Sequence, residues 1–253
     1  MHGPAIARAE SVIEGLRLAP EDYAPVEPSS DVRIQGDASN LVLARPGLKA
    51  RLSVNFGSAR GCRVLLGTDL QGSLQIGFSG DESLVVIGER CVLHELQIRS
   101  KQAGDFIAIG NGVTTTAKNT WISGAGAGAG RPWLIIGDDC MFAYDIVIRN
   151  SDAHPIYAID GPLQLNEPAS GVCLEPHVWV GEDVKILKDL TIGAGSIVAM
   201  GSIVTRDIPR ASVARGIPAV ATPAHDRYWA RNDLPRSRER ALHFHRRYPP
   251  SSN

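Results

Sequence analysis

The segment NSDAHPIY (150–157) carries residue types that suit proton-transfer chemistry. Asp152 and His154 are two residues apart, so in extended backbone their side chains share one face. A carboxylate in this place can accept a hydrogen bond from one imidazole nitrogen and leave the other nitrogen as a base. The spacing therefore predicts a general base at His154 that is oriented by Asp152. Packing or surface polarity is the alternative role for a single histidine.

Aliphatic residues recur at every sixth position in the C-terminal half of the chain. They are Leu174, Val180, Ile186, Ile192, Val198 and Val204, each followed four residues later by an apolar or small residue. A helix repeats apolar residues at three and four positions and a strand at two, so this period predicts very short strands joined by tight turns. Gly181 and Gly193 are expected at these turns because glycine tolerates a positive φ.

The same pattern is less regular upstream, where loops must interrupt it. It appears at Ile87, Ile109, Ile136, Phe142 and Ile148. The next inward positions after Ile148 are Asp152 and His154, and burying them without partners would cost a few kcal/mol. We therefore expect the chain to leave the repeat here and to form a loop over 155–173, which is where a functional site is expected. A second excursion is expected at GAGAGAG (124–130), which lacks the last glycine of a dinucleotide-binding fingerprint.

Composition and charge exclude several classes of protein. The 253 residues include 26 Lys and Arg against 27 Asp and Glu, so the basic surface of a nucleic-acid-binding protein is not expected. Four cysteines without a CxxC pair indicate reduced thiols. No apolar stretch approaches the ~20 residues of a membrane span, and Glu10 and Glu14 interrupt the place of a signal peptide. The expected location is cytoplasmic.

The six-residue period resembles that of the hexapeptide-repeat acyltransferase family, whose chains coil into a left-handed parallel β-helix with three hexads in each triangular coil. The resemblance is strong over 87–218 and weaker over 32–86. It implies an all-β fold with short terminal helices and inserted loops. The expected parts are an N-terminal helical cap (1–30), the β-helix (31–222) with loops near 123–133 and 155–173, and a basic C-terminal helix and tail (223–253).

Both ends of the chain lack the repeat and carry helical patterns. Residues 4–17 predict a short amphipathic helix that caps the first coil. Residues 236–248 predict a basic helix with Leu242 and Phe244 as packing points. This helix is either a solvated surface element or an attractor for an anionic acceptor or a cofactor phosphate.

Within the family, SDAHPIY followed by the Trp of VWVG, 25 residues after the His, resembles the sugar and polysaccharide O-acetyltransferases. The resemblance implies that His154 is the general base and that Trp179 lies beside acetyl-CoA, the co-substrate. It also implies direct acetyl transfer to a sugar hydroxyl of a cell-surface polysaccharide or its precursor, in a homotrimer with active sites between subunits. Neither a metal nor a nucleic acid partner is expected.

The segment 198–220 resembles the CoA-binding end of these enzymes. The further cofactor contacts that the resemblance implies are Met200, Gly201, Thr205, Arg206, Gly216 and Pro218. Val220 stands where many relatives have Lys or Arg. Arg215 or the basic tail is the candidate replacement for that phosphate contact.

Other functions compete with O-acetyl transfer. An amino-sugar N-acetyltransferase and a non-catalytic β-helical scaffold fit the same repeat. A γ-class carbonic anhydrase is disfavoured because His94, His154 and His177 are far apart in the sequence, so a zinc site is hard to assemble. Cys173 is a poor candidate for an acyl-enzyme nucleophile, and Cys140 occupies an inward position that suits packing.

Overall fold

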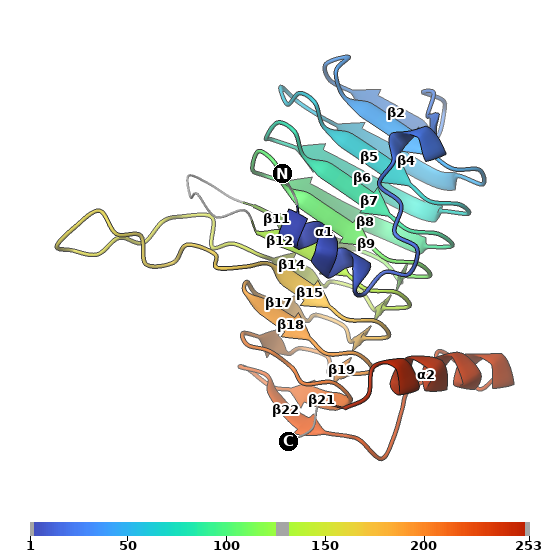
Figure 1. The fold of residues 1–253 in the computed structure, drawn as a ribbon, viewed down its shortest axis with the longest axis vertical. Helices are drawn as coiled ribbons and strands as arrows, with labels where there is room; N and C mark the ends of the chain where they lie inside the picture. Colours follow the sequence, from blue (N-terminus) through green and yellow to red (C-terminus); the bar gives the residue numbers. More distant parts are fainter. Residues whose placement is uncertain (1–2, 125–131, 251–253) are drawn as a thin grey trace.

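The structure is a computed structural model that describes residues 3–124 and 132–250. The chain winds into a tall prism of stacked coils, a left-handed parallel β-helix (Figure 1). The predicted fold class is therefore confirmed. Most of the excursion expected at 124–130 lies outside the described residues.

The first face of the prism is a sheet to which each successive coil adds one parallel strand. Its strands are β3 (Leu41–Ala44), β5 (Arg63–Leu66), β7 (Leu84–Ile87), β9 (Phe106–Ile109), β12 (Trp133–Ile136), β15 (Val172–Leu174) and β18 (Leu190–Ile192), with β1 (Ala24–Pro25) antiparallel on β3. Leu174 and Ile192 are partners in neighbouring coils, so one complete coil here spans 18 residues, as three hexads require. Leu66 and Ile87 are partners 21 residues apart, so the N-terminal coils are longer.

The other two faces separate only in the C-terminal part. The second face holds β10 (Thr114–Thr115), β13 (Met141–Phe142), β16 (Trp179–Val180), β19 (Ile197–Val198), β21 (Ser212–Arg215) and the antiparallel β22 (Val220–Pro223). The third face holds β11 (Asn119–Ser123), β14 (Val147–Arg149), β17 (Lys185–Ile186) and β20 (Ile203–Val204). Nearer the N-terminus these faces are continued by β2 (Val32–Gln35), β4 (Lys49–Asn55), β6 (Gln71–Phe78) and β8 (Val92–Ser100). β8 passes around the corner, because its start pairs with β10 and its end with β11.

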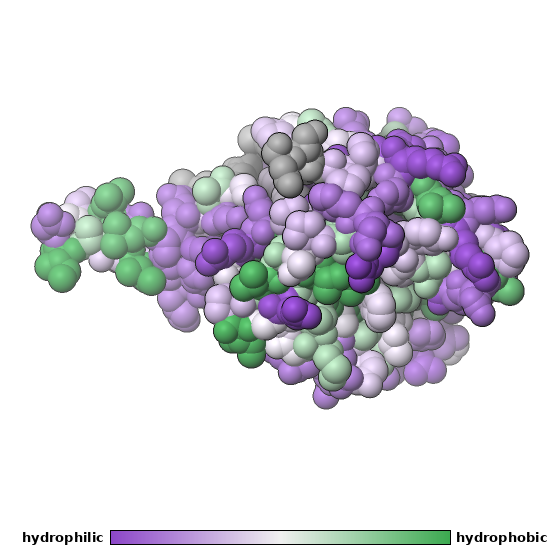
Figure 2. Space-filling view, turned by 90° about the horizontal axis from the view of Figure 1, so that it is seen from below, coloured by the Kyte–Doolittle hydropathy of each residue, from purple (hydrophilic) through white to green (hydrophobic). Residues whose placement is uncertain are grey.

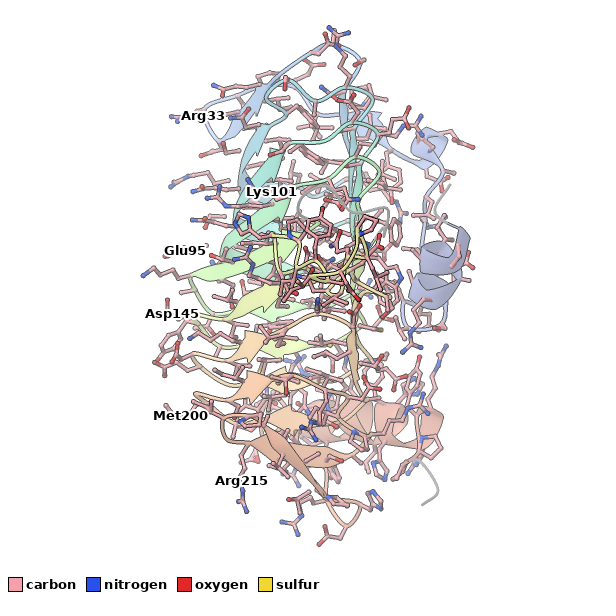
Figure 3. The ribbon with its side chains drawn as sticks, turned by 90° about the vertical axis from the view of Figure 1, so that its left-hand side faces the viewer. Arg33, Glu95, Lys101, Asp145, Met200 and Arg215 are labelled. Carbon is pink, nitrogen blue, oxygen red and sulfur yellow. The ribbon has the colours of Figure 1, made fainter. Side chains whose placement is uncertain are left out.

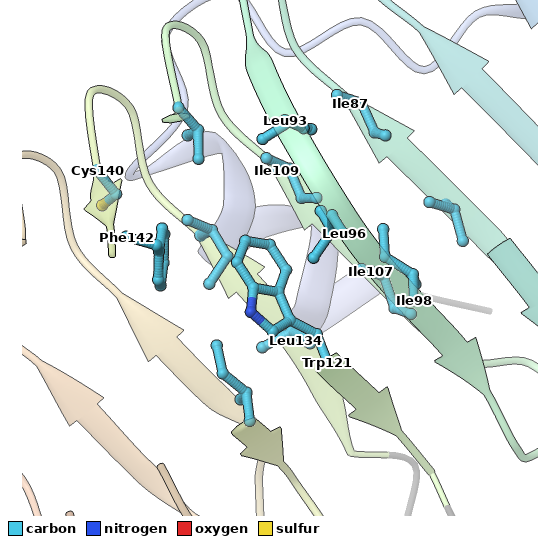
Figure 4. Packing of buried hydrophobic residues seen from close by; sticks show 14 of the residues in the cluster. Ile87, Leu93, Leu96, Ile98, Ile107, Ile109, Trp121, Leu134, Cys140 and Phe142 are labelled. Atoms are coloured by element: carbon cyan, nitrogen blue, oxygen red, sulfur yellow. The ribbon is translucent and has the colours of Figure 1, made fainter. Parts of the chain in front are cut away.

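The predicted inward residues form the core of the prism. All six aliphatic residues of the hexad series, from Leu174 to Val204, have no exposed surface. Nearer the N-terminal end of the prism, Trp121 fills the interior. Its ring is tilted against that of Phe142, with ring centroids 4.7 Å apart (Figure 4). Each such side chain stabilises the fold by about 25 cal/mol per Å² of apolar surface buried, so the aliphatic ladder is the main source of stability. The period-six interpretation is confirmed.

The glycines of the repeat have a different role from the one expected. A Cβ atom at Gly181 would lie 2.7 Å from the backbone nitrogen of Met200, and one at Gly193 would lie 2.4 Å from that of Arg210. These positions need glycine because successive coils approach closely there. Positive φ angles occur two residues later, at Asp183 and Gly195.

The N-terminal helix α1 (Gly3–Glu10) covers the side of the prism and does not cap its first coil. Ala5 and Ala9 of the helix are buried against outward residues of the first face, among them Ile135 and Cys173. Those outward residues are apolar and need cover, which is why the helix lies there. The 3₁₀ turn η1 (Pro20–Asp22) follows.

The basic helix α2 (Pro235–Arg247) matches the expected range to within one residue at each end. Phe244 is buried, as expected, together with Ala241, whereas Leu242 is only half-buried. Of the helices in the described ranges, none combines the length and the apolar character that crossing a bilayer requires.

Candidate functional site

The chain leaves the coil after β14, at the corner between the third and first faces. Asn150 and Ser151 are still buried, whereas Asp152 and His154 are exposed. A hairpin follows, with a bridge between Tyr157 and Gln164, and it projects far from the side of the prism (Figure 1). The coil resumes at β15. The predicted break in the repeat is therefore confirmed.

Lys188 ties the root of this hairpin to the next coil. Its ammonium group donates hydrogen bonds to the Asp152 carboxylate at 2.5 Å and to the Asn166 carbonyl at 2.7 Å. The Asn166 amide donates to the same carboxylate at 3.0 Å and to the backbone carbonyl of His154 at 2.9 Å. The hydrogen bond from Lys188 lowers the pKa of Asp152 below its ordinary value. The carboxylate therefore stays ionised and holds the two ends of the hairpin together.

The expected pairing of Asp152 with the ring of His154 requires correction. Ala153 has a φ of +70°, so the backbone is not extended and the flanking side chains do not share a face. Asp152 is engaged by Lys188 and Asn166 instead. Within the described ranges no hydrogen bond reaches the imidazole of His154, which is exposed. Asp152 thus positions the hairpin, and the ring of His154 is accessible to a substrate.

Trp179 lies on the second face, with 38% of its surface exposed. It is in register between Met141 and Ile197 of the adjacent coils. The corner from which the His154 hairpin leaves is the one opposite this face. A single chain therefore does not bring His154 and Trp179 together.

Four of the residues expected at the cofactor gather at one corner near the C-terminal end. Met200 is 69% exposed and Gly201 has a φ of +70°, both between the second and third faces. Gly216 and Pro218 lie in the adjoining turn between β21 and β22, where the Gly216 carbonyl accepts a hydrogen bond from the backbone of Ile203 at 3.1 Å.

Thr205 and Arg206 do not join this group. Both are exposed directly after β20, at the same corner as the hairpin and two coils further along. Arg215 is exposed and is the direct antiparallel partner of Val220, so it lies next to the position where the expected basic residue is missing.

A buried polar cluster at another corner was not expected from the sequence. The Nδ1 atom of His177 lies 2.7 Å from the Asp139 carboxylate, which also accepts hydrogen bonds from Arg231 at 3.1 Å and Arg240 at 2.8 Å. The His177 ring stacks on Trp229, with centroids 3.9 Å apart. Burial raises the pKa of Asp139, but the hydrogen bond from His177 and the two guanidinium groups outweigh it, so the net pKa is lowered.

This cluster docks the C-terminal segment onto the prism. It places Trp229 beside Trp179, with ring centroids 6.0 Å apart. In the sequence, the acidic pair of IGDDCM was the one sign of this cluster, because Asp139 directly precedes the inward residue Cys140. Its basic partners come from beyond the end of the repeat, so no spacing rule connects them to it.

The cysteine thiols are not ionised at neutral pH, so none of them is a candidate nucleophile. All four cysteines are unpaired and buried, and burial raises the pKa of Cys173 to about 12, so its thiol is not ionised at neutral pH. In the part of the chain that the structure describes, no three His, Cys, Asp or Glu side chains are grouped as metal ligands. His177 is buried against Asp139, whereas His154 lies on the hairpin.

Asp105 predicts a measurable pH dependence of stability. Its buried carboxylate accepts hydrogen bonds from the Ser100 hydroxyl and from the backbone of Lys101 and Gln102, yet burial raises its pKa to about 6. The folded state therefore binds the proton more tightly than the unfolded chain. Its contribution to stability is full below about pH 4 and is lost, by about 3 kcal/mol, as the pH rises through 6. Urea unfolding of Asp105→Asn is expected to lack this loss.

The control for this prediction is Asp233→Asn, which alters a carboxylate that is 94% exposed. It should keep the pH dependence of the unmodified protein. Asp139 and Glu175 have lowered pKa values and titrate below this window, whereas burial also raises the pKa of Asp138, so the test is the difference between Asp105→Asn and the unmodified protein. An Asp105→Asn variant that loses as much stability between pH 4 and pH 7 as the unmodified protein would contradict the assignment.

The stacked hexad coils form the fold that the sequence resemblance implies, that of the hexapeptide-repeat acyltransferases. No family model matches the chain. A polysialic acid O-acetyltransferase from Escherichia coli O1:K1 is 35% identical over 135 residues, which are 53% of this chain and 43% of that protein. Another from Neisseria meningitidis is 31% identical over 136 residues, 48% of this chain and 63% of that protein. The chain thus spans less than two thirds of the length of these relatives.

A solved structure extends the similarity along the prism. The crystal structure of the polySia-specific acetyltransferase NeuO superposes with a TM-score of 0.75 at 28% sequence identity, covering 86% of this chain and 91% of that chain. The predicted resemblance to hexapeptide-repeat acyltransferases is confirmed by the fold and by these relatives.

Proposed function

We propose that the protein is an acetyl-CoA-dependent O-acetyltransferase that acts on a sugar hydroxyl of a cell-surface polysaccharide or its precursor. The observation that carries this proposal is the exposed His154 on a hairpin that leaves the coil, in a chain whose relatives are named polysialic acid O-acetyltransferases. A polymer of sialic acid is therefore the first acceptor to test. The cytoplasm, where the free cysteines stay reduced, is the proposed location.

The proposed reaction is a direct transfer within a ternary complex. A sugar hydroxyl is a poor nucleophile at neutral pH because very little of it is ionised. His154 takes the hydroxyl proton as the oxygen attacks the thioester carbonyl, the new C–O bond forms and the C–S bond breaks. The imidazolium then returns the proton to the CoA thiolate. The buried Cys173 thiol takes no part.

The active form is a homotrimer with sites between subunits. Two features support this. His154 and Trp179 lie on opposite sides of one chain, so a site that uses both needs two copies. The hairpin also carries exposed apolar side chains, seen as green atoms on the projecting lobe in Figure 2, and a neighbouring subunit can bury them. They are Ile156, Ile159, Leu163 and Leu165.

The cofactor lies along the C-terminal coils in this proposal. Trp179 packs against acetyl-CoA from the second face, next to the backbone of Met200 and Gly201. The turn with Gly216 and Pro218 receives the nucleotide end, and Arg215 replaces the basic residue missing at Val220. Thr205 and Arg206 contact the cofactor bound at the neighbouring interface, because they lie at the corner between the third and first faces and not at that of Met200 and Gly201.

Acetyl-CoA binding tests this function directly. A ligand at 100 times its Kd stabilises the folded state by about 2.7 kcal/mol, which a thermal melt detects. Trp179→Ala is expected to raise the KM for acetyl-CoA about tenfold, because an aromatic contact of roughly 1.4 kcal/mol is lost. Leu41→Ala, a similarly exposed residue on the first face, is the control. A protein that acetyl-CoA does not stabilise at millimolar concentration is a scaffold and not a transferase.

A further inference from the structure

A polar groove of about 670 Å³ crosses the outward side of β2, β4, β6 and β8. It lies on the N-terminal coils, away from Trp179 and the CoA-binding end. Arg33, Ser53, Gln75 and Gln97 form its central row, one residue from each coil, in register from strand to strand. The function proposed above does not use this groove.

The groove presents a regular ladder of hydrogen-bonding groups. Neighbouring parallel strands are about 4.8 Å apart, so each step along the prism adds one guanidinium, hydroxyl or amide. The adjacent row contains Arg51, Ser73 and Glu95, and the Ser73 hydroxyl accepts a hydrogen bond from the backbone of Glu95 at 2.9 Å. Such a ladder matches an extended chain of sugar units, which offers hydroxyl groups at regular intervals.

The lining of the groove does not resemble a subunit interface. The centres of protein interfaces are apolar and depleted in charged residues. Five charged side chains line this groove, namely Asp31, Arg33, Arg51, Glu95 and Lys118. Two of them, Asp31 and Arg51, lie 3.8 Å apart as a pair, whereas within the described residues Arg33 has no ion-pair partner. The guanidinium of Arg33 is therefore available to bind a carboxylate of an acidic polysaccharide, although the nearby Glu95 carboxylate likewise has no ion-pair partner within the described residues.

The central row leads toward the candidate catalytic histidine. Gln97 is in register with Thr120 of β11, and Thr120 with Val147 of β14, the strand that ends at the hairpin of His154. In Figure 3, Arg33 lies near the N-terminal end of this side of the prism, Glu95 and Asp145 follow along the same edge, and the hairpin projects toward the viewer. A chain that lies in the groove thus points to the hairpin.

We propose that this groove holds the acceptor polysaccharide, an acidic polymer, at sugar units several positions away from the one that is acetylated. This inference rests on the proposed transferase function. Gln75 and Gln97 bind hydroxyl groups of the extended chain, and Arg33 binds a carboxylate. The groove therefore favours long acceptors over short ones without touching the reacting atoms.

The test compares a long sialic acid polymer with a trimer of the same sugar. The double variant Gln75→Ala/Gln97→Ala is expected to raise the Kd and the KM for the polymer about tenfold or more, because two hydrogen bonds are lost. The KM for acetyl-CoA and the rate with the trimer should stay unchanged. Gln71→Ala is the matched control, since Gln71 is an exposed residue of the same strand, β6, outside the groove. Unmodified affinity for the polymer in the double variant would overturn the proposal.

A variant that removes the charge of Arg33 tests the groove independently of the transferase function. Arg33→Gln is expected to weaken polymer binding and to reduce its dependence on salt, whereas Arg63→Gln on the first face should change neither. Polymer binding is measured without acetyl-CoA, by titration of the purified protein. If the protein does not bind acetyl-CoA but the groove variants still weaken polymer binding, the groove assignment is supported and the proposed transferase function is refuted. If the protein binds acetyl-CoA but the groove variants do not change polymer binding, only the groove assignment is refuted.

Discussion

Replacing His154 with alanine is expected to lower the rate of acetyl transfer by about 10²–10⁴-fold, the usual contribution of a general base. The side chain is exposed and its ring has no hydrogen-bond partner within the described residues, so its removal leaves the hairpin contacts of Asp152, Asn166 and Lys188 in place. The fold and acetyl-CoA binding should therefore be unaffected. The measurement is incorporation of labelled acetyl groups into the polysaccharide.

The control for this substitution is His94→Ala, because His94 is also exposed but lies on β8, away from the hairpin. It should retain the full rate. A His154→Ala variant that transfers acetyl groups as fast as the unmodified protein would refute the assigned base. Loss of acetyl-CoA stabilisation in the same variant would indicate a binding role for His154 in place of proton transfer.

Replacing Asp139 with alanine is expected to have the largest effect on stability, a loss of about 3–5 kcal/mol of unfolding free energy. The carboxylate is buried and is shared by His177, Arg231 and Arg240, so its removal takes an acceptor away from the buried His177 ring and from two partly buried guanidinium groups. Urea unfolding measures this loss. Asp145→Ala is the control, because that carboxylate is exposed and lies 3.7 Å from Lys118, a surface pair worth less than about 1 kcal/mol.

Asp139 also links stability to the environment of Trp179. Without the carboxylate the C-terminal segment is held only by its remaining contacts, which include the Arg231 hydrogen bonds to the Gly112 and Cys140 carbonyls, so Trp229 separates from Trp179 more easily. We expect the tryptophan fluorescence of Asp139→Ala to shift at urea concentrations below the main transition. Because the pKa of Asp139 is lowered, its contribution is present above about pH 4 and is lost as the pH falls further. Unfolding at the urea concentration of the unmodified protein would show that the segment docks by other contacts.

Periodicity alone located the inward side chains and the point where the coil is interrupted. From Leu174 to Val204 the step of six residues assigns one buried aliphatic to each short strand, and the positions four residues later add Val178, Val184 and Leu190, because each coil repeats the same three short strands. After Ile148 the polar Asp152 and His154 fall on inward positions, and the chain does leave the coil there. These inferences succeed because inward or outward direction depends on local spacing.

Only the tertiary structure decided which distant residues meet. His177 binds Asp139 across 38 residues and Trp229 across 52, and no repeat relates those positions. The left-handed backbone of Ala153 separates the side chains of Asp152 and His154, although their spacing predicts a shared face. The row from Arg33 to Gln97 exists only because coils of unequal length come into register. The physical reason is that contacts between neighbouring coils decide which distant residues meet. The sequence pattern shows only whether each side chain points inward or outward within its own coil.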